Sequence, residues 1–93
     1  MDLTESIVDN LRVRDLLTLV DAICKSRGVT LAEVCGRRRS QAVSRTRQEV
    51  WWHLRHHPEY FYSYPEIARL FGRDHATVIA GVDAHERRTV ASH

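Results

Sequence analysis

The sequence predicts an all-α fold, a compact bundle of five to six helices that contains a helix–turn–helix. Apolar residues recur at helical spacing along most of the chain. No alternating run of β-branched residues and no Asn-Gly hairpin signal is present. Two capping boxes, Thr30 with Glu33 and Ser63 with Glu66, mark helix starts. At 93 residues, 43% of them hydrophobic, the chain is expected to fold as one domain with a small core.

The first third of the chain predicts two helices and a short third one. A first helix over about residues 1–12 follows from Leu3, Ile7, Val8 and Leu11. A second, over about 13–27, follows from Val13, Leu16, Leu17, Val20, Ile23 and Cys24. Gly28 then stands in the position of a C-terminal cap, and the box at Thr30 opens a short helix that Gly36 ends. We expect the first helix to pack on the domain's own core; an interaction element or dimer contact is the alternative.

The middle of the chain predicts a loop, a long helix and a turn. Residues 37–43 are expected to form a loop, after which Ser44 caps a helix. The apolar stripe of that helix consists of Val43, Val50, Trp51 and Leu54. Pro58 closes it, because the residue before a proline is pushed out of the α region. The aromatic residues of the following turn are expected to pack in or near the core, not to stack on bases: Tyr60, Phe61, Tyr62 and Tyr64.

The last third predicts two helices around Gly72. The first, about residues 64–71, buries Ile67, Leu70 and Phe71. The second, about residues 74–88, is capped by Asp74 and turns three apolar side chains inward, those of Val78, Ile79 and Val82. Residues 89–93 carry no core signal and are expected to form a flexible, fraying tail. The domain proper is therefore expected to span residues 13–88.

Positive charge is concentrated after residue 36 and is carried almost entirely by arginine. Residues 1–36 hold four basic and six acidic residues, whereas residues 37–93 hold ten basic and six acidic. Within residues 37–55, six arginines accompany a single carboxylate, that of Glu49. The planar fork of arginine suits bidentate contacts with phosphate and guanine. The asymmetry favours a basic face for a polyanion, although charge alone fits a solvated surface equally well.

The helix pair around Gly72 predicts a DNA-binding helix–turn–helix. Polar residues gather at the start of its second helix, where such motifs reach base edges in the major groove. The carboxylate of Asp74 can accept from cytosine, and His75 can donate to a purine. The hydroxyl of Thr77 and the free amides of a first turn suit a phosphate. Taken alone, Asp74 fits a simple N-cap, and His75 fits an incidental exposed position.

Two motifs, taken together, carry a family resemblance. Residues 37–48 read RRRSQAVSRTRQ, and residues 65–78 read PEIARLFGRDHATV. They resemble the basic loop, the arginine–glutamine helix start and the signature helix–turn–helix of the C-terminal DNA-binding domain (domain IV) of the bacterial replication initiator DnaA. The resemblance extends over about residues 13–88. It implies a TrpR-like, all-helical fold and binding to DnaA-box-like sites in double-stranded DNA.

The resemblance also implies roles for individual residues. Arg39, the last arginine of the triplet, matches the residue that enters the minor groove. Asp74 and His75 match base-reading residues of the recognition helix. Arg47 and Gln48 match contacts to the DNA backbone. The full set implied to bind DNA is Arg37, Arg38, Arg39, Arg45, Arg47, Gln48, Arg55, Arg73, Asp74, His75, Ala76 and Thr77.

The chain departs from the family pattern at several positions. It has one glycine, Gly72, where the family usually has two, and Ala76 where the family has a threonine. Gln41 stands in place of a common arginine and Thr46 in place of a common proline. These differences bear on the expected base preference more than on the fold. No glycine-rich phosphate loop is present, so we expect no ATPase domain and no origin melting by this chain alone.

We therefore expect a stand-alone, sequence-specific duplex-DNA-binding protein that regulates replication initiation or transcription. It is expected to be a monomer or weak dimer, with the full-length initiator as a candidate partner. The alternative is a protein–protein adaptor that binds the initiator or another partner without specific DNA recognition. The retained Arg39, Arg47, Asp74 and His75 argue against that alternative.

Other classes of function find little support in the sequence. We expect no enzyme activity, no cofactor and no metal site, because His53, His56 and His57 have no evident further ligand. Cys24 and Cys35 are expected to be small buried residues, with a redox pair as the alternative. No apolar run approaches the ~18 residues of a membrane span, and the acidic start is no signal peptide. The expected location is cytoplasmic, at the nucleoid.

Overall fold

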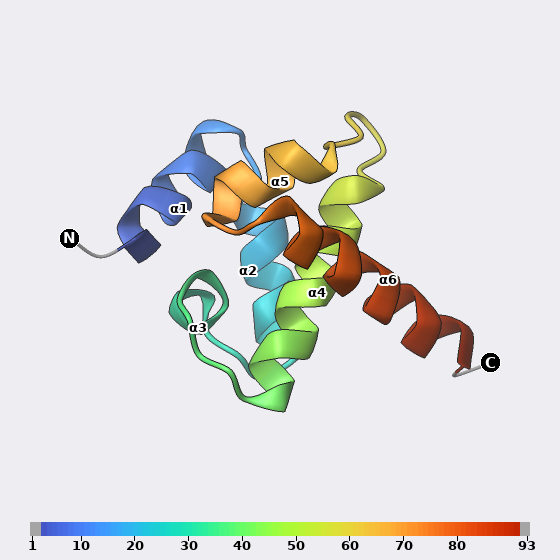
Figure 1. The fold of residues 1–93 in the computed structure, drawn as a ribbon. Helices are drawn as coiled ribbons and strands as arrows, with labels where there is room; N and C mark the ends of the chain where they lie inside the picture. The colour runs from blue at the N-terminus through green and yellow to red at the C-terminus, as the bar shows by residue number, and fades with distance from the viewer. Residues whose placement is uncertain (1–2, 92–93) are drawn as a thin grey trace.

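The computed structural model describes residues 3–91, which form helices joined by short loops, with no strand among them. The elements are α1 (Leu3–Val13), α2 (Leu17–Ser26), α3 (Leu31–Cys35), α4 (Gln41–Arg55), α5 (Tyr64–Phe71) and α6 (His75–Ala91). The predicted all-α class is confirmed. Figure 1 shows α4 at the centre, with α6 crossing it and α5 beside the start of α6. None of these helices is long and apolar enough to cross a bilayer.

The central helix α4 is buried on the sides that face α2, α3, α5 and α6. Its Trp51 packs edge-to-face against Phe71 of α5, with ring centroids 6.2 Å apart. The approach to α6 is so close that a Cβ on Gly81 would lie 2.7 Å from the Trp51 ring. The position of α6 is therefore fixed by a glycine backbone resting on an indole.

The helix pair α5–α6 forms the predicted helix–turn–helix. Both hydrogen bonds of the capping box at Ser63 and Glu66 are present, which confirms the predicted start of α5. Gly72 ends α5 in the left-handed conformation, at φ 63°, where a residue without Cβ is favoured. α6 begins three residues later. The capping box at Thr30 is likewise confirmed, and Gly36 ends α3 as predicted.

The start of α4 differs from the prediction. The Ser40 hydroxyl accepts from the Val43 amide at 3.3 Å, so residues 41–43 belong to the helix and the predicted cap at Ser44 is wrong. Ser44 lies in the first turn, where its amide donates to the Ser40 carbonyl. Hydrophobic periodicity could not reveal this turn, because Gln41 and Ala42 are both exposed.

The first helix packs on the domain's own core. Ile7 and Leu11 are buried, and α1 contacts α2, α3 and α5. The predicted start of the second helix is wrong: Val13 ends α1 and is 86% exposed. The chain reverses at Asp15, whose φ of 60° lies in the left-handed region, which Asp tolerates better than most residues. α2 then begins at Leu17.

Three apolar side chains that were expected inside are exposed: Tyr60 (50%), Phe61 (65%) and Ile79 (41%). The Tyr60 hydroxyl donates to Glu66 at 2.8 Å, so its ring stays at the surface. In α6 the buried face is made by Val78 and Val82, one turn apart, and the residue that follows Val78 points about 100° away. Tyr62, by contrast, is buried as predicted.

The predicted tail is helical as far as the structure describes it. α6 continues through Ala91, and the Thr89 hydroxyl donates to the His85 carbonyl at 2.9 Å. Residues 92–93 lie outside the described residues. Cys24 and Cys35 are both free and buried, which confirms the expectation that they are small core residues.

Candidate nucleic-acid interface

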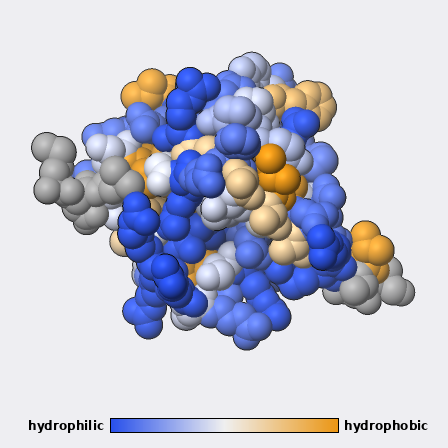
Figure 2. Space-filling view, viewed as in Figure 1, coloured by the Kyte–Doolittle hydropathy of each residue, from blue (hydrophilic) through white to orange (hydrophobic). Residues whose placement is uncertain are grey.

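The segment that joins α3 to α4, residues 36–40, carries the arginine triplet and is here called the arginine loop. Arg37, Arg38 and Arg39 are all exposed. Arg38 lies 3.6 Å from Glu33, whereas Arg37 and Arg39 have no ion pair within residues 3–91. Figure 2 shows hydrophilic side chains over this part of the surface. Two guanidinium groups of the loop are therefore available for an external anion.

The first turn of α6 presents polar side chains that have no hydrogen-bond partner among residues 3–91. Asp74, His75, Ala76 and Thr77 are exposed. Asp74 occupies the N-cap position, since its carbonyl accepts from the amides of Thr77 at 3.0 Å and Val78 at 3.3 Å. Its carboxylate makes no capping bond within the described chain, nor do the ring of His75 and the hydroxyl of Thr77 hydrogen bond there.

A direct contact holds these two elements together. The guanidinium of Arg73, in the turn before α6, donates to the carbonyl of Gly36, in the arginine loop. Burial and the nearby Arg37 lower the pKa of Arg73, but a guanidinium remains charged at neutral pH. The arginine loop and the tip of α6 therefore lie side by side on one face (Figure 1). Binding to two adjacent grooves at once requires this arrangement.

A cleft of about 610 Å³ lies along the contact between α4 and the first half of α6. It is lined by Ser44, Arg47, Gln48, Trp51, Arg73, Ala76, Thr77, Ala80, Gly81 and Ala84. The α6 wall consists mainly of small residues, which keeps the cleft open beside the polar tip. The α4 wall supplies hydrogen-bond donors.

Arg47 lies in this cleft but is turned into the protein. The residue is 6% exposed, and its Nε donates to the Val34 carbonyl at 2.9 Å. One terminal nitrogen donates to the carbonyls of Glu33, Gly36 and Arg38 at 3.1–3.2 Å. Burial, followed by the charge of Arg73, lowers the pKa of Arg47. Most of the hydrogen-bond donors of Arg47 are therefore used within the protein, although the resemblance assigns this residue a contact with the DNA backbone.

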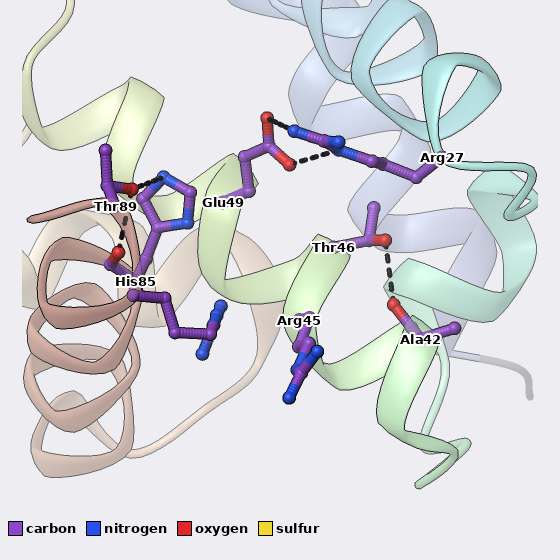
Figure 3. Close-up of a pocket in the computed structure, with 8 residues that line it drawn as sticks. Arg27, Ala42, Arg45, Thr46, Glu49, His85 and Thr89 are labelled. Carbon is purple, nitrogen blue, oxygen red and sulfur yellow. Dashed lines mark hydrogen bonds and ion pairs between the residues drawn. The ribbon is translucent and has the colours of Figure 1, made fainter. Parts of the chain in front are cut away.

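A second cleft, of about 340 Å³, opens at the other end of the α4–α6 contact (Figure 3). Arg27 and Glu49 form a two-point ion pair across it, with N–O distances of 2.7 and 3.1 Å. Arg45 also lines this cleft, and no hydrogen bond joins it to the other side chains drawn in Figure 3. Arg45 is exposed, so it is available to a phosphate.

Arg88 is a basic residue of this surface that the sequence reasoning missed. It lines the second cleft and donates to the Gln48 side-chain oxygen at 2.8 Å. Burial, followed by the charge of Arg45, lowers the pKa of Arg88. Helical spacing could have predicted its place, because positions 77, 81, 84 and 88 lie along one face of α6. Gln48 therefore has its amide nitrogen left for an external acceptor.

Arg55 sits near the far end of α4 and is half-buried. Its guanidinium lies over the ring of Tyr64, 4.9 Å from the centroid. Tyr64 in turn lines a third hollow, together with Ala76, Ile79 and Ala80 of α6. Arg55 thus lies near the side of α6 that carries Ala76, Ile79 and Ala80.

The three histidines of α4 and its C-terminal end have separate partners. His53 lies 3.8 Å from Glu49, and His56 lies 3.3 Å from Glu86. His57 accepts from the amides that follow it. Over residues 3–91, no three His, Cys, Asp or Glu side chains come together as a metal site.

Comparison with known families matches residues 17–84 to the bacterial DnaA protein helix-turn-helix. Comparison with curated proteins and with solved structures gave no match. The matched residues run from the first residue of α2 to the middle of α6 and include the arginine loop and the helix–turn–helix.

Proposed function

This chain belongs to the bacterial DnaA helix-turn-helix family, and we propose that it recognises DnaA-box-like sites by contacting two adjacent grooves of one duplex. It is a DNA-binding helix–turn–helix protein of the DnaA type. The finer proposal rests on the exposed first turn of α6, whose Asp74, His75 and Thr77 side chains have no hydrogen-bond partner in the described part of the chain. The contact between Arg73 and Gly36 holds this turn beside the arginine loop.

In the major groove, the start of α6 supplies both kinds of hydrogen-bonding group. The carboxylate of Asp74 is an acceptor suited to the amino group of cytosine, and His75 is suited to a purine edge. The methyl of Ala76 offers apolar contact to thymine. Thr77 and the open amides of the turn suit the adjacent phosphate. The small residues Ala80 and Ala84 leave room for the duplex along the same helix.

In the minor groove, Arg39 supplies a guanidinium that forms no ion pair with a carboxylate of residues 3–91. A narrow A·T-rich groove carries an enhanced negative potential and attracts such a group. Arg37, Arg45, Gln48 and Arg55 flank the two reading elements and can contact phosphates, which fix the register but carry no sequence information. A short asymmetric box bound by one monomer follows from this division of roles.

The test is a selection of bound duplexes from a random pool at near-physiological salt. We expect enrichment of one short box with a G·C-containing part and an adjoining A·T-rich part. Absence of any enriched box would contradict the proposal and favour an adaptor that binds a partner protein through this fold. The matched control is the double variant Asp74→Ala/His75→Ala, whose recognition turn is stripped of both base-reading groups.

As a regulatory role, we propose competition with the full-length initiator for shared boxes. Support comes from the shared family, since related recognition turns are expected to read related boxes. Footprinting of an origin fragment with both proteins present tests this. Occupancy of the initiator at shared boxes should fall as this protein is added, whereas unchanged occupancy at saturating concentration would contradict competition.

A further inference from the structure

The most fully bonded side chain in the interface is Arg47, and the carbonyls that accept from it all lie in one short segment. The carbonyls of Glu33, Val34, Gly36 and Arg38 all accept from it. One terminal nitrogen, with two hydrogens, serves three of these carbonyls, so at least one hydrogen bond is shared. Carbonyls at a helix C-terminus lack partners within the helix, and here α3 ends at Cys35. Arg47 supplies those partners from α4.

The Gly36 carbonyl receives a second guanidinium, that of Arg73. One carbonyl of the arginine loop is thus tied both to α4 and to the turn that precedes α6. Neither Arg47 nor Arg73 has a carboxylate partner among the residues described, so peptide dipoles alone balance two adjacent positive charges. A Cβ at Gly36 would lie 3.0 Å from the Ala32 carbonyl oxygen, so a side chain would be crowded at this position.

We propose that Arg47 is a positioning residue that, with Arg73, fixes the arginine loop relative to the recognition helix. This inference rests on the proposed function, because the loop and the helix are the two reading elements. If the loop is fixed in this way, recognition of the two grooves is coupled, because Arg39 enters the minor groove at a fixed distance from Asp74 and His75 in the major groove. A phosphate contact at position 47 would have a different effect, adding affinity without setting preference.

Lysine at position 47 separates these two roles. It keeps the positive charge that a phosphate contact needs, but its single ammonium group cannot form the fork that reaches four carbonyls. Arg47→Lys is therefore expected to loosen the loop while retaining charge. The matched control is Arg69→Lys, on the exposed face of α5 and outside the interface. A second control, Arg45→Met, removes a candidate phosphate contact from the same helix.

The first measurement is hydrogen exchange of the loop amides at positions 37–39 in the free protein. We expect exchange about tenfold faster or more in Arg47→Lys, with the amides of α4 and α6 little changed, because local opening becomes easier. Arg69→Lys should exchange like the parent protein. Unchanged loop exchange in Arg47→Lys would overturn the positioning role. This readout involves no DNA, so it stands or fails independently of the proposed function.

The second measurement is affinity for duplexes that vary separately in the A·T-rich and in the major-groove part of the selected box. In Arg47→Lys, the ratio of affinities for duplexes with and without the A·T-rich part should fall toward one. The dependence of affinity on salt should stay unchanged. Arg45→Met should weaken binding to all duplexes alike and reduce the salt slope by about one. Near-parental affinity and preference in Arg47→Lys would identify a phosphate contact and overturn the inference.

Should Arg47→Lys fail to fold, as circular dichroism would show, Arg73→Lys serves the same test. Arg73 is only half-buried, and it donates to the same Gly36 carbonyl from the turn that precedes α6. Its loss should also speed loop exchange and weaken the A·T preference. Slow loop exchange in a folded Arg73→Lys variant would count against the shared carbonyl as the point of coupling.

Discussion

Asp74 and His75 are neighbours in the chain, yet they offer opposite chemistry to a base pair. The carboxylate only accepts hydrogen bonds, whereas a histidine ring can donate. Both are exposed and have no internal partner in the described chain, so neither must break a bond within the protein before it binds. We therefore expect both side chains to contribute to the preference of the protein for particular base pairs.

Replacing His75 by alanine should cost ~1–3 kcal/mol on the preferred box and flatten the preference at the base pair it contacts. The fold should be untouched, because the ring is exposed. Equilibrium binding to the selected box and to single-base variants measures both effects. Equal weakening on every duplex would show that His75 contacts only the backbone.

At the scale of helices, the crossing of α4 and α6 depends on the absence of one side chain. Gly81→Ala improves helix propensity by up to about 1 kcal/mol, but it drives a methyl group into the Trp51 ring, which is 2% exposed. Overpacking of this kind costs roughly 1–3 kcal/mol. Urea unfolding should show a net loss of stability.

A double-mutant cycle with Trp51→Leu isolates that contact. Combined with the smaller side chain, Gly81→Ala should cost less than it does alone, since residues in contact are not additive. If the changes in the free energy of unfolding are strictly additive, the loss of stability in Gly81→Ala does not come from contact with Trp51.

The two capping boxes make the stability of the protein depend on pH in the acid range. Hydrogen bonds from the backbone amide of Ser63 and from Tyr60 lower the pKa of Glu66, and bonds from Thr30 lower the pKa of Glu33. A carboxylate whose pKa is lower when folded stabilises the protein above its unfolded value of about 4.3, and that stabilisation is lost as the pH falls through the folded value.

The double variant Glu33→Gln/Glu66→Gln should therefore lose less stability than the parent protein between neutral pH and pH ~3. Urea unfolding across this range provides the comparison, and Glu59→Gln, in the exposed turn after α4, serves as the matched control. Parallel pH profiles for all three proteins would show that the boxes contribute no acid dependence.

The sequence predicted those elements whose signals are local. Capping boxes and the glycine at position 72 act within a few residues, and both predictions were confirmed. The start of α4 was missed because Gln41 and Ala42 are exposed and give no periodic signal, and only the fold shows that Ser40 caps the helix. The inward orientation of Arg47 could not be predicted, because its acceptors lie 9–14 residues away, in the short helix α3 and the loop that follows it.

At the scale of the whole molecule, the dimensions of 40 × 27 × 24 Å match about one turn of duplex, roughly 34–36 Å. One monomer on one box should thus protect about ten base pairs. Hydroxyl-radical footprinting checks this, and protection over two turns would indicate a dimer on the site.

Affinity should also fall steeply with salt, with a log–log slope of about −0.9 for each phosphate neutralised. Several exposed arginines of the interface, among them Arg37, Arg39 and Arg45, predict a slope of about −3 or steeper by that relation. Titrations between low and near-physiological salt measure it. A slope near zero would contradict a basic surface that binds the duplex backbone.

Burial raises the pKa of the Cys24 and Cys35 thiols to about 11, so very few molecules carry a reactive thiolate at neutral pH. An alkylating reagent should therefore modify the protein chiefly at moments when the core opens. Cys35 ends α3, at the edge of the arginine loop, so its modification rate reports opening at that edge. Slower alkylation of Cys35 in the presence of duplex would show that bound DNA suppresses local opening of the core at the end of α3.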